Sequence, residues 1–131
     1  MGASRYIKEA FAASMKSGAV RERVRAWKQG NTVQRVEKPL NPVRARELGY
    51  KAKKGYFVVR VKTKRGKRTR NRPQLGRKPG RNRKRENPGK PWQWFAEQKA
   101  LHRCRNAELV GSYFAGGDGS SQFFDVLLKT K

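Results

Sequence analysis

The N-terminal end of the chain carries hydrophobic side chains at helical spacing. Ile7, Ala10, Phe11 and Ser14 recur at the i, i+3, i+4 and i+7 positions. This spacing predicts a short amphipathic helix over residues 3–15, with one face suited to packing and the others to solvent.

A second helix is predicted after Gly18. Val20, Val24 and Trp27 line one stripe, and Gly30 with Asn31 ends the segment. We expect Trp27 to anchor the core, with base stacking as the alternative. The other faces are cationic and suit phosphate better than water. They carry Arg21, Arg23, Arg25 and Lys28.

Alternation replaces helical spacing in the next part of the chain. Residues 32–38 alternate and are rich in β-branched side chains, which predicts a short strand that Pro39 ends. Asn41 is a good N-cap and Pro42 suits the first helical position, so we expect a helical turn there that ends at Gly49.

The clearest strand is predicted over residues 56–63. The pleat of a strand places successive side chains on opposite faces. It should therefore separate a hydrophobic core face from an exposed cationic face. The first face holds Phe57, Val59 and Val61, and the second holds Arg60 and Lys62.

The C-terminal part predicts one helix and one hairpin. Residues 92–105 form a helix entered at Pro91, and residues 108–114 and 121–129 alternate as strands joined by a glycine-rich loop. The helix should place Phe95, Gln98, Ala100, Leu101 and Cys104 inward, and Glu97 and Lys99 outward. The order of elements predicts an α+β fold, a small four-stranded, mostly antiparallel sheet packed with helices.

Residues 64–90 lose the hydrophobic pattern. Leu75 is their only large aliphatic residue and Glu86 their only acidic one, so no core can form and the composition predicts disorder in the free protein. We interpret residues 1–131 as a single domain. It divides into basic N-terminal helices (1–30), an α/β core (31–63 and 91–131) and an extended basic arm (64–90).

Charge changes the picture most. The 131 residues hold 34 Lys and Arg against nine Asp and Glu, a net charge of +25, while the hydrophobic fraction of 35% is low. Like charges at this density oppose compaction unless a polyanion screens them. Phosphate backbones are such polyanions. Binding of Lys and Arg to them is favourable because it releases condensed counterions.

The basic arm also lacks aromatic side chains, since residues 62–90 contain no Phe, Tyr or Trp. The arm should therefore bind by phosphate contacts and shape, without base stacking.

Other uses of the charge fit less well. A membrane surface favours a helix with an apolar face, which the most basic part lacks, and no run approaches the length of a membrane span. The single cysteine, Cys104, excludes an intramolecular disulfide and fits a reducing cytosol. With His102 as the only histidine, a Cys/His zinc site within the chain is excluded. We expect no metal, cofactor, membrane or small-molecule substrate.

The sequence shows no catalytic pair. The acidic residues are scattered singly, so we expect no enzyme. One alternative is a small metal-dependent nuclease whose carboxylates meet in the fold, and the candidates are Glu47, Glu97, Glu108, Asp118 and Asp125. A Cys/His nucleophile at Cys104 is a second alternative, but a buried thiol beside a phosphate-facing His102 fits the predicted helix better.

One motif carries a family resemblance. The run Leu48-Gly49-Tyr50-Lys51-Ala52-Lys53-Lys54-Gly55-Tyr56, continuing through Val58-Val59-Arg60-Val61, closely resembles the large-subunit ribosomal protein family numbered fifteen in archaea and eukaryotes. Both ends of the chain are also similar to that family. This chain departs from the family at Gly111, Phe114 and Ala115, where the family usually has Asn, Trp and Val. The resemblance implies a structural protein of the large subunit in the cytoplasm, bound to its large rRNA and to neighbouring ribosomal proteins.

We therefore expect the rRNA contacts to lie in the motif and the basic arm, with a second surface on the helix after Gly18. Structural Mg²⁺ would be held only through the rRNA. A free-standing nucleic-acid chaperone or a chromatin-like DNA-binding protein is the main alternative. The predicted contacts are Arg21, Arg23, Arg25, Arg44, Arg46, Tyr50, Lys51, Lys53, Lys54, Arg60, Lys62, Lys64, Arg65, Lys67, Arg68, Arg70, Arg72, Arg77, Lys78, Arg81, Arg83, Lys84, Arg85 and Lys90.

Overall fold

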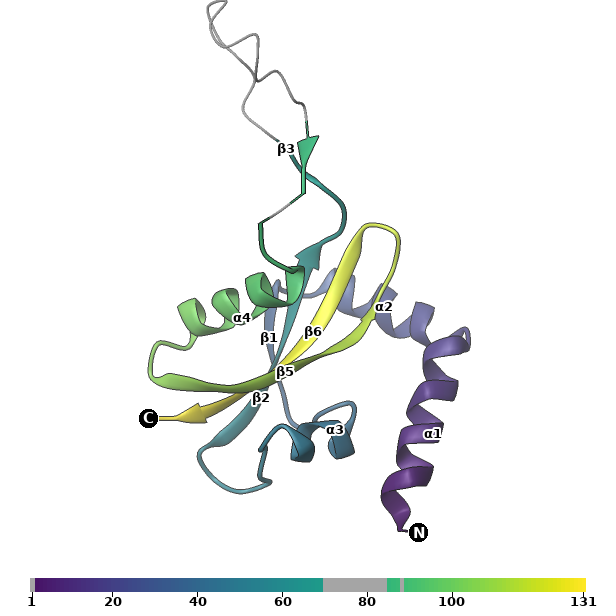
Figure 1. Cartoon of the computed structure of the whole chain (residues 1–131), viewed down its shortest axis with the longest axis vertical. Coiled ribbons are helices and arrows are strands. Elements are labelled where there is room, and N and C mark those ends of the chain that lie inside the picture. The colour runs from purple at the N-terminus through teal and green to yellow at the C-terminus, as the bar shows by residue number, and fades with distance from the viewer. Residues whose placement is uncertain (1, 70–84, 88) are drawn as a thin grey trace, which may run out of the picture.

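The computed structural model describes residues 2–69, 85–87 and 89–131. Apart from the two short strands β3 (Arg68–Thr69) and β4 (Arg85–Glu86), which were not predicted, their elements follow the predicted order, which confirms the α+β fold class (Figure 1). They are α1 (Ala3–Lys16), α2 (Ala19–Gln29), β1 (Val33–Val36), α3 (Pro42–Glu47), β2 (Tyr56–Lys64), β3 (Arg68–Thr69), β4 (Arg85–Glu86), α4 (Trp92–Arg103), β5 (Ala107–Gly117) and β6 (Ser121–Thr130).

The main sheet has four strands in the order β1-β2-β6-β5. Every strand pair in the described residues is antiparallel. The register places Arg60 of β2 opposite Asp125 of β6, and Asp125 opposite Tyr113 of β5. These residues therefore form one row across the sheet, on the same face.

Helices cover both faces of this sheet. On one face, α4 packs on Val59, Val61 and Val126. On the other face, the cluster at α2 contains Phe123, and the cluster at α3 contains Leu127. The central strand β6 is consequently buried without interruption from residue 123 to 128, as expected for a strand covered on both sides.

This covering overturns the exposed cationic face that the alternation of β2 predicts. Val58 on that face is fully buried, and the side chain of Arg60 is only 10% exposed. The prediction was wrong because a strict alternation identifies which residues share a face, while here a second layer of helices lies over the polar one.

The inward side of α4 also differs from the prediction in two places. Ala96 and Ala100 are the fully buried residues of the helix, and Cys104 packs at the edge of the same cluster as predicted. Gln98, predicted inward, is exposed, because it lies about 200° around the helix from Ala96. Glu97, predicted outward, is half-buried and accepts a hydrogen bond from the Ser112 hydroxyl.

Arg60 and Asp125 form the buried ion pair at the centre of the α2 and α3 side. Arg60 donates through Nε to Oδ1 (2.8 Å) and through a terminal nitrogen to Oδ2 (3.1 Å) of Asp125, which is fully buried. Tyr113 donates its hydroxyl to Oδ2 at 2.8 Å, and the Leu40 backbone N–H donates to the same oxygen at 3.3 Å. The guanidinium lies 4.1 Å from the centre of the Trp27 ring, which confirms Trp27 as a core anchor.

The Tyr113 hydroxyl extends this network to the start of α3. Burial, and then the negative charge of Asp125, raise the pKa of Tyr113 well above its usual range. The phenol therefore remains a hydrogen-bond donor to Asp125, while its oxygen accepts the backbone N–H of Asn41 at 3.1 Å. One buried carboxylate thus holds β2, β5, β6 and the N-terminus of α3 together.

We predict that Asp125→Asn lowers the free energy of unfolding by about 3–5 kcal/mol, because it leaves a buried guanidinium without its counter-charge. Urea denaturation followed by circular dichroism measures the change. Replacing both partners, in Arg60→Met with Asp125→Leu, should restore only part of the loss, because no charge is left unpaired but the Tyr113 hydroxyl and the Leu40 N–H lose their acceptor. The control is Glu9→Gln, which removes an exposed pair with Arg5 and should change little. An unchanged midpoint for Asp125→Asn would show that the ion pair does not support the fold.

Candidate nucleic-acid interface

The lysine loop, residues 50–55, joins α3 to β2 and presents cations outward. Gly49 precedes the loop and Gly55 is its last residue, with φ angles of +105° and +92°, a backbone region that glycine enters without a steric penalty. Lys51, Lys53 and Lys54 are exposed between these two turns. The motif that carries the family resemblance is thus a cationic surface loop fixed at both ends.

Helix α3 adds two arginines beside the lysine loop. The Asn41 side chain caps the helix by accepting the Arg44 backbone N–H at 3.1 Å, as the sequence predicts. Arg44 and Arg46 are exposed. Glu47 pairs with Lys8 of α1 at 2.5 Å and with Arg44 at 3.3 Å, and these cations lower the pKa of the Glu47 carboxyl. Arg46 is left to face solvent next to the loop.

A cleft of about 550 Å³ lies where α3 and the lysine loop meet the segment after β1. We call it the α3 cleft. Its cationic lining consists of Lys38, Arg46, Lys53 and Lys54. Lys38 was not among the predicted contacts, because it precedes the motif in sequence and only the fold brings it to the same cleft as Lys53 and Lys54.

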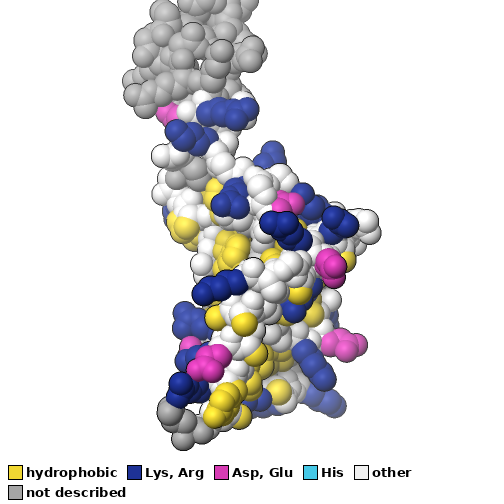
Figure 2. Space-filling model, turned by 90° about the vertical axis from the view of Figure 1, so that its right-hand side faces the viewer, with side chains coloured by type: hydrophobic (Ala, Val, Ile, Leu, Met, Phe, Trp, Pro, Cys, Tyr) yellow, Lys and Arg dark blue, Asp and Glu magenta, His cyan; other side chains and the backbone are white. Residues whose placement is uncertain are grey.

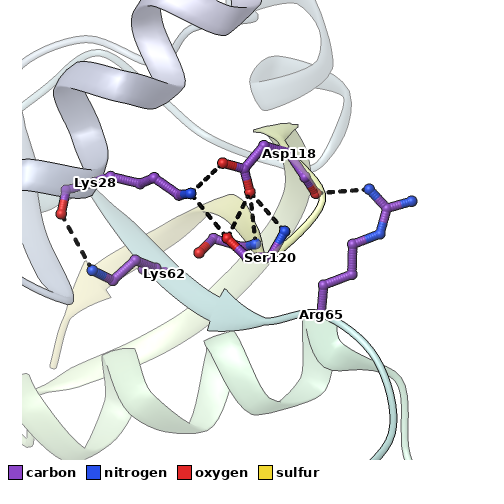
Figure 3. Close-up of polar contacts among 6 residues, drawn as sticks. Lys28, Lys62, Arg65, Asp118 and Ser120 are labelled. Atoms are coloured by element: carbon purple, nitrogen blue, oxygen red, sulfur yellow. Dashed lines mark hydrogen bonds and ion pairs between the residues drawn. The ribbon is translucent and has the colours of Figure 1, made fainter.

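A second cationic region lies where the basic arm leaves β2 (Figure 3). The Lys28 ammonium pairs with the Asp118 carboxylate and donates to the Ser120 hydroxyl at 2.9 Å. Arg65 donates through its side chain to the Asp118 carbonyl at 2.8 Å and through its backbone N–H to the Ser120 carbonyl at 3.1 Å. The Lys62 ammonium donates to the Lys28 carbonyl at 3.5 Å. The tip of the β5–β6 hairpin therefore holds both the end of α2 and the first residues of the arm.

Asp118 organises this tip. Its Oδ1 accepts the backbone N–H groups of Ser120 at 2.9 Å and Ser121 at 2.8 Å. The bond to Lys28, followed by the Ser120 backbone bond, lowers the pKa of Asp118 well below its usual range. The glycine-rich segment is a turn, as expected. The negative charge of Asp118 in this turn holds Lys28 at the end of α2.

The two ends of the arm run side by side. β3 and β4 pair antiparallel, with Arg68 opposite Glu86 and Thr69 opposite Arg85. This pairing was not predicted, because two-residue strands leave no hydrophobic pattern in so polar a segment. The prediction of disorder for the rest of the arm falls on residues 70–84 and 88, which lie outside the described residues.

Cations crowd together beside the root of the arm, by which we mean residues 64–69 and 85–87, where the arm leaves the core and β3 pairs with β4. Lys99 of α4 is exposed and donates to the Lys62 carbonyl at 3.0 Å. Partial burial, and then the nearby charges of Lys64 and Lys62, lower the pKa of Lys99. Because these charges repel one another, a bound polyanion would relieve the repulsion and favour the charged form of Lys99.

The structure sorts the predicted contacts. Arg23 and Lys62 are half-buried, Tyr50 lines the α3 cleft, and Arg60 was predicted wrongly, because it pairs with Asp125 in the interior. The exposed ones are Arg21, Arg25, Arg44, Arg46, Lys51, Lys53, Lys54, Lys64, Arg65, Lys67, Arg85 and Lys90. The side chain of Arg68 is not described, and outside the described residues lie Arg70, Arg72, Arg77, Lys78, Arg81, Arg83 and Lys84.

Figure 2 shows the side of the molecule that carries α1 and α2. Lys and Arg side chains are spread over this face and flank a strip of hydrophobic ones, while acidic side chains lie singly among them. None of the described helices has the length and hydrophobicity needed to cross a bilayer. In the same residues, no three His, Cys, Asp or Glu side chains gather in a way that could hold a metal ion.

These features define a class: small, strongly basic α+β proteins whose folded core displays an excess of cations at its surface. The chain belongs to the Ribosomal L15 family, whose model matches residues 2–130. It is similar to the large ribosomal subunit protein eL15 of Methanocorpusculum labreanum, with 39% identity over 127 residues. That match covers 94% of this chain and 66% of the relative, so the chain spans just under two thirds of the relative's length.

We predict that two substitutions of Asp118 separate its two roles. Asp118→Ala removes the acceptor for the Ser120 and Ser121 amides, which should exchange hydrogen faster by about ten-fold or more. Asp118→Asn keeps an acceptor oxygen and loses only the ion pair with Lys28, so these amides should stay protected. Amide exchange measured by NMR tests both variants. Equal protection in Asp118→Ala and in the parent chain would contradict the role of the carboxylate in the turn.

Proposed function

We propose that this chain is a structural component of the large ribosomal subunit that binds and stabilises large-subunit rRNA. The observation that carries the proposal is membership of the Ribosomal L15 family together with a surface excess of cations. The lysine loop, α3 and the root of the arm present these cations on a rigid core. The chain would thus be located in the ribosome, in the cytoplasm. Its role would be structural and not catalytic.

The physical basis of this binding is electrostatic. Lys and Arg side chains that neutralise phosphates release counterions, a gain independent of base sequence. Arg forms forked contacts with phosphate, while Lys acts as a point charge. The paired strands β3 and β4 present the exposed cations Lys67 and Arg85 beside the core. Neighbouring ribosomal proteins complete the surroundings, and any Mg²⁺ is held by the rRNA, with no cofactor bound by the chain itself.

We predict a steep salt dependence for the complex between the full chain and its rRNA domain. If about ten phosphates are contacted, the logarithm of the association constant should fall with the logarithm of salt concentration with a slope of roughly −7 to −9. Filter binding or fluorescence anisotropy at several KCl concentrations gives the slope. A slope near zero would contradict the electrostatic account.

We predict that the arm contributes charge to binding and little to the fold. Residues 67–89 hold ten of the 34 Lys and Arg, whereas Lys64 and Arg65 belong to β2 and the hairpin contacts and should be kept. Replacing residues 67–89 with a short Gly-Ser linker should leave a cooperatively folding core and abolish stable RNA binding. A second variant of unchanged length, with these ten residues replaced by Gln, separates charge from length. Loss of folding in both variants would contradict this division.

Two rivals have distinct outcomes. A free-standing chaperone or chromatin-like protein would leave large ribosomal subunits during a high-salt wash, whereas a structural component should sediment with them. A nuclease would cleave RNA or DNA in a magnesium-dependent manner. Among the described residues, no three acidic side chains gather in a way that could hold a metal ion, and three of the candidates are paired with cations, Asp125 with Arg60, Asp118 with Lys28 and Glu47 with Lys8.

A further inference from the structure

The α3 cleft differs in character from the rest of the cationic surface. Its volume of about 550 Å³ is lined by apolar as well as charged side chains, among them Pro39, Pro42 and Tyr50. Pockets that bind small organic groups usually measure about 300–1,000 Å³ and combine apolar walls with a few polar groups. Phosphate contacts alone require no such walls, because a phosphate binds at exposed cations.

Tyr50 is held rigidly at this cleft. Its backbone N–H donates to the Ala45 carbonyl at 2.9 Å, and its ring packs against the core cluster beneath α3. The Tyr56 ring lies edge-on to it, with 6.2 Å between the ring centres. A half-buried aromatic side chain fixed in this way loses little conformational entropy when a ligand contacts it.

The charges around the cleft identify the kind of ligand. Four of the nine lining residues are cations (Lys38, Arg46, Lys53 and Lys54), and Glu37 is the only acidic one. The ligand should therefore carry a flat apolar group for the walls and negative charge for the rim. A nucleotide has both, since every base has a π-face and every nucleotide a phosphate.

We propose that the α3 cleft binds a single unpaired nucleotide of the RNA, with the base against Tyr50 and the two prolines and its flanking phosphates at the cationic rim. The inference rests on the proposed function and adds a base-dependent contact to it. In duplex RNA the bases are stacked and out of reach, so the cleft selects a bulge or loop nucleotide that is turned outward. The arm supplies phosphate contacts that do not depend on base position. The cleft determines at which nucleotide of the RNA the protein is aligned.

The test uses the full chain and two RNA hairpins of equal nucleotide number. One has a fully paired stem, and the other has one unpaired adenosine in the stem, with its former partner moved to the terminal loop. The chain should bind the bulged RNA about ten-fold more tightly, the range expected for one base stacked on one aromatic ring. Both RNAs should show steep and similar salt dependence, because they carry the same number of phosphates.

Variants assign the preference to Tyr50. Tyr50→Phe should retain it, because the ring face remains. Tyr50→Leu preserves apolar packing in the core and should remove the preference while leaving binding to the paired RNA unchanged. Tyr6→Ala is the matched control, since Tyr6 lies on α1 with 68% exposure and should not affect the preference. Thermal unfolding of each variant verifies that the fold is intact.

The outcomes separate the inference from the function on which it rests. Equal affinity for the two RNAs, with a steep salt dependence, would overturn the nucleotide site and leave rRNA binding in place. The same would follow if Tyr50→Leu kept the preference. Displacement of both RNAs by free adenosine monophosphate at low millimolar concentration would assign the cleft to a free nucleotide instead. A lack of salt-dependent binding to either RNA would overturn the proposed function itself.

Discussion

The ion pair between Arg60 and Asp125 lies where five elements of the molecule meet. Two charges removed from water are tolerated only when their geometry and remaining hydrogen bonds are nearly complete. Here the carboxylate receives Arg60, the Tyr113 hydroxyl and the Leu40 N–H, and the guanidinium lies on Trp27. The pair therefore links β2, β5 and β6 to the start of α3 and to α2.

This arrangement divides the net charge of +25 into two kinds of cation. Arg60 and Lys28 are matched by carboxylates and hold elements together. The nine Asp and Glu are too few to match the 34 Lys and Arg. Most of the remaining Lys and Arg among the described residues consequently face solvent, on α2, α3, the lysine loop and the ends of the arm. The excess that opposes compaction in an isolated chain becomes the surface that a polyanion can bind.

The surface cations fall into regions with different physical roles. At the root of the arm, crowded lysines and a paired β3–β4 ladder favour phosphate contacts that do not depend on base sequence. At the α3 cleft, an anchored Tyr50 adds a flat apolar surface beside the cations. Phosphate contacts position a protein on RNA, and base contacts specify where it binds. A rigid core that displays both can combine affinity with register.

The local features of this protein were set by its sequence alone. Helical spacing, the Asn41 cap, the alternation of the strands and the quoted motif predicted the element order, the fold class and the family, because each signal acts within a few residues. The tertiary structure decided which faces are covered. It placed Arg60 inside, paired β3 with β4 and brought Lys38 to Tyr50. A side-chain pattern identifies residues on a common face, but only packing between distant segments determines what lies over that face.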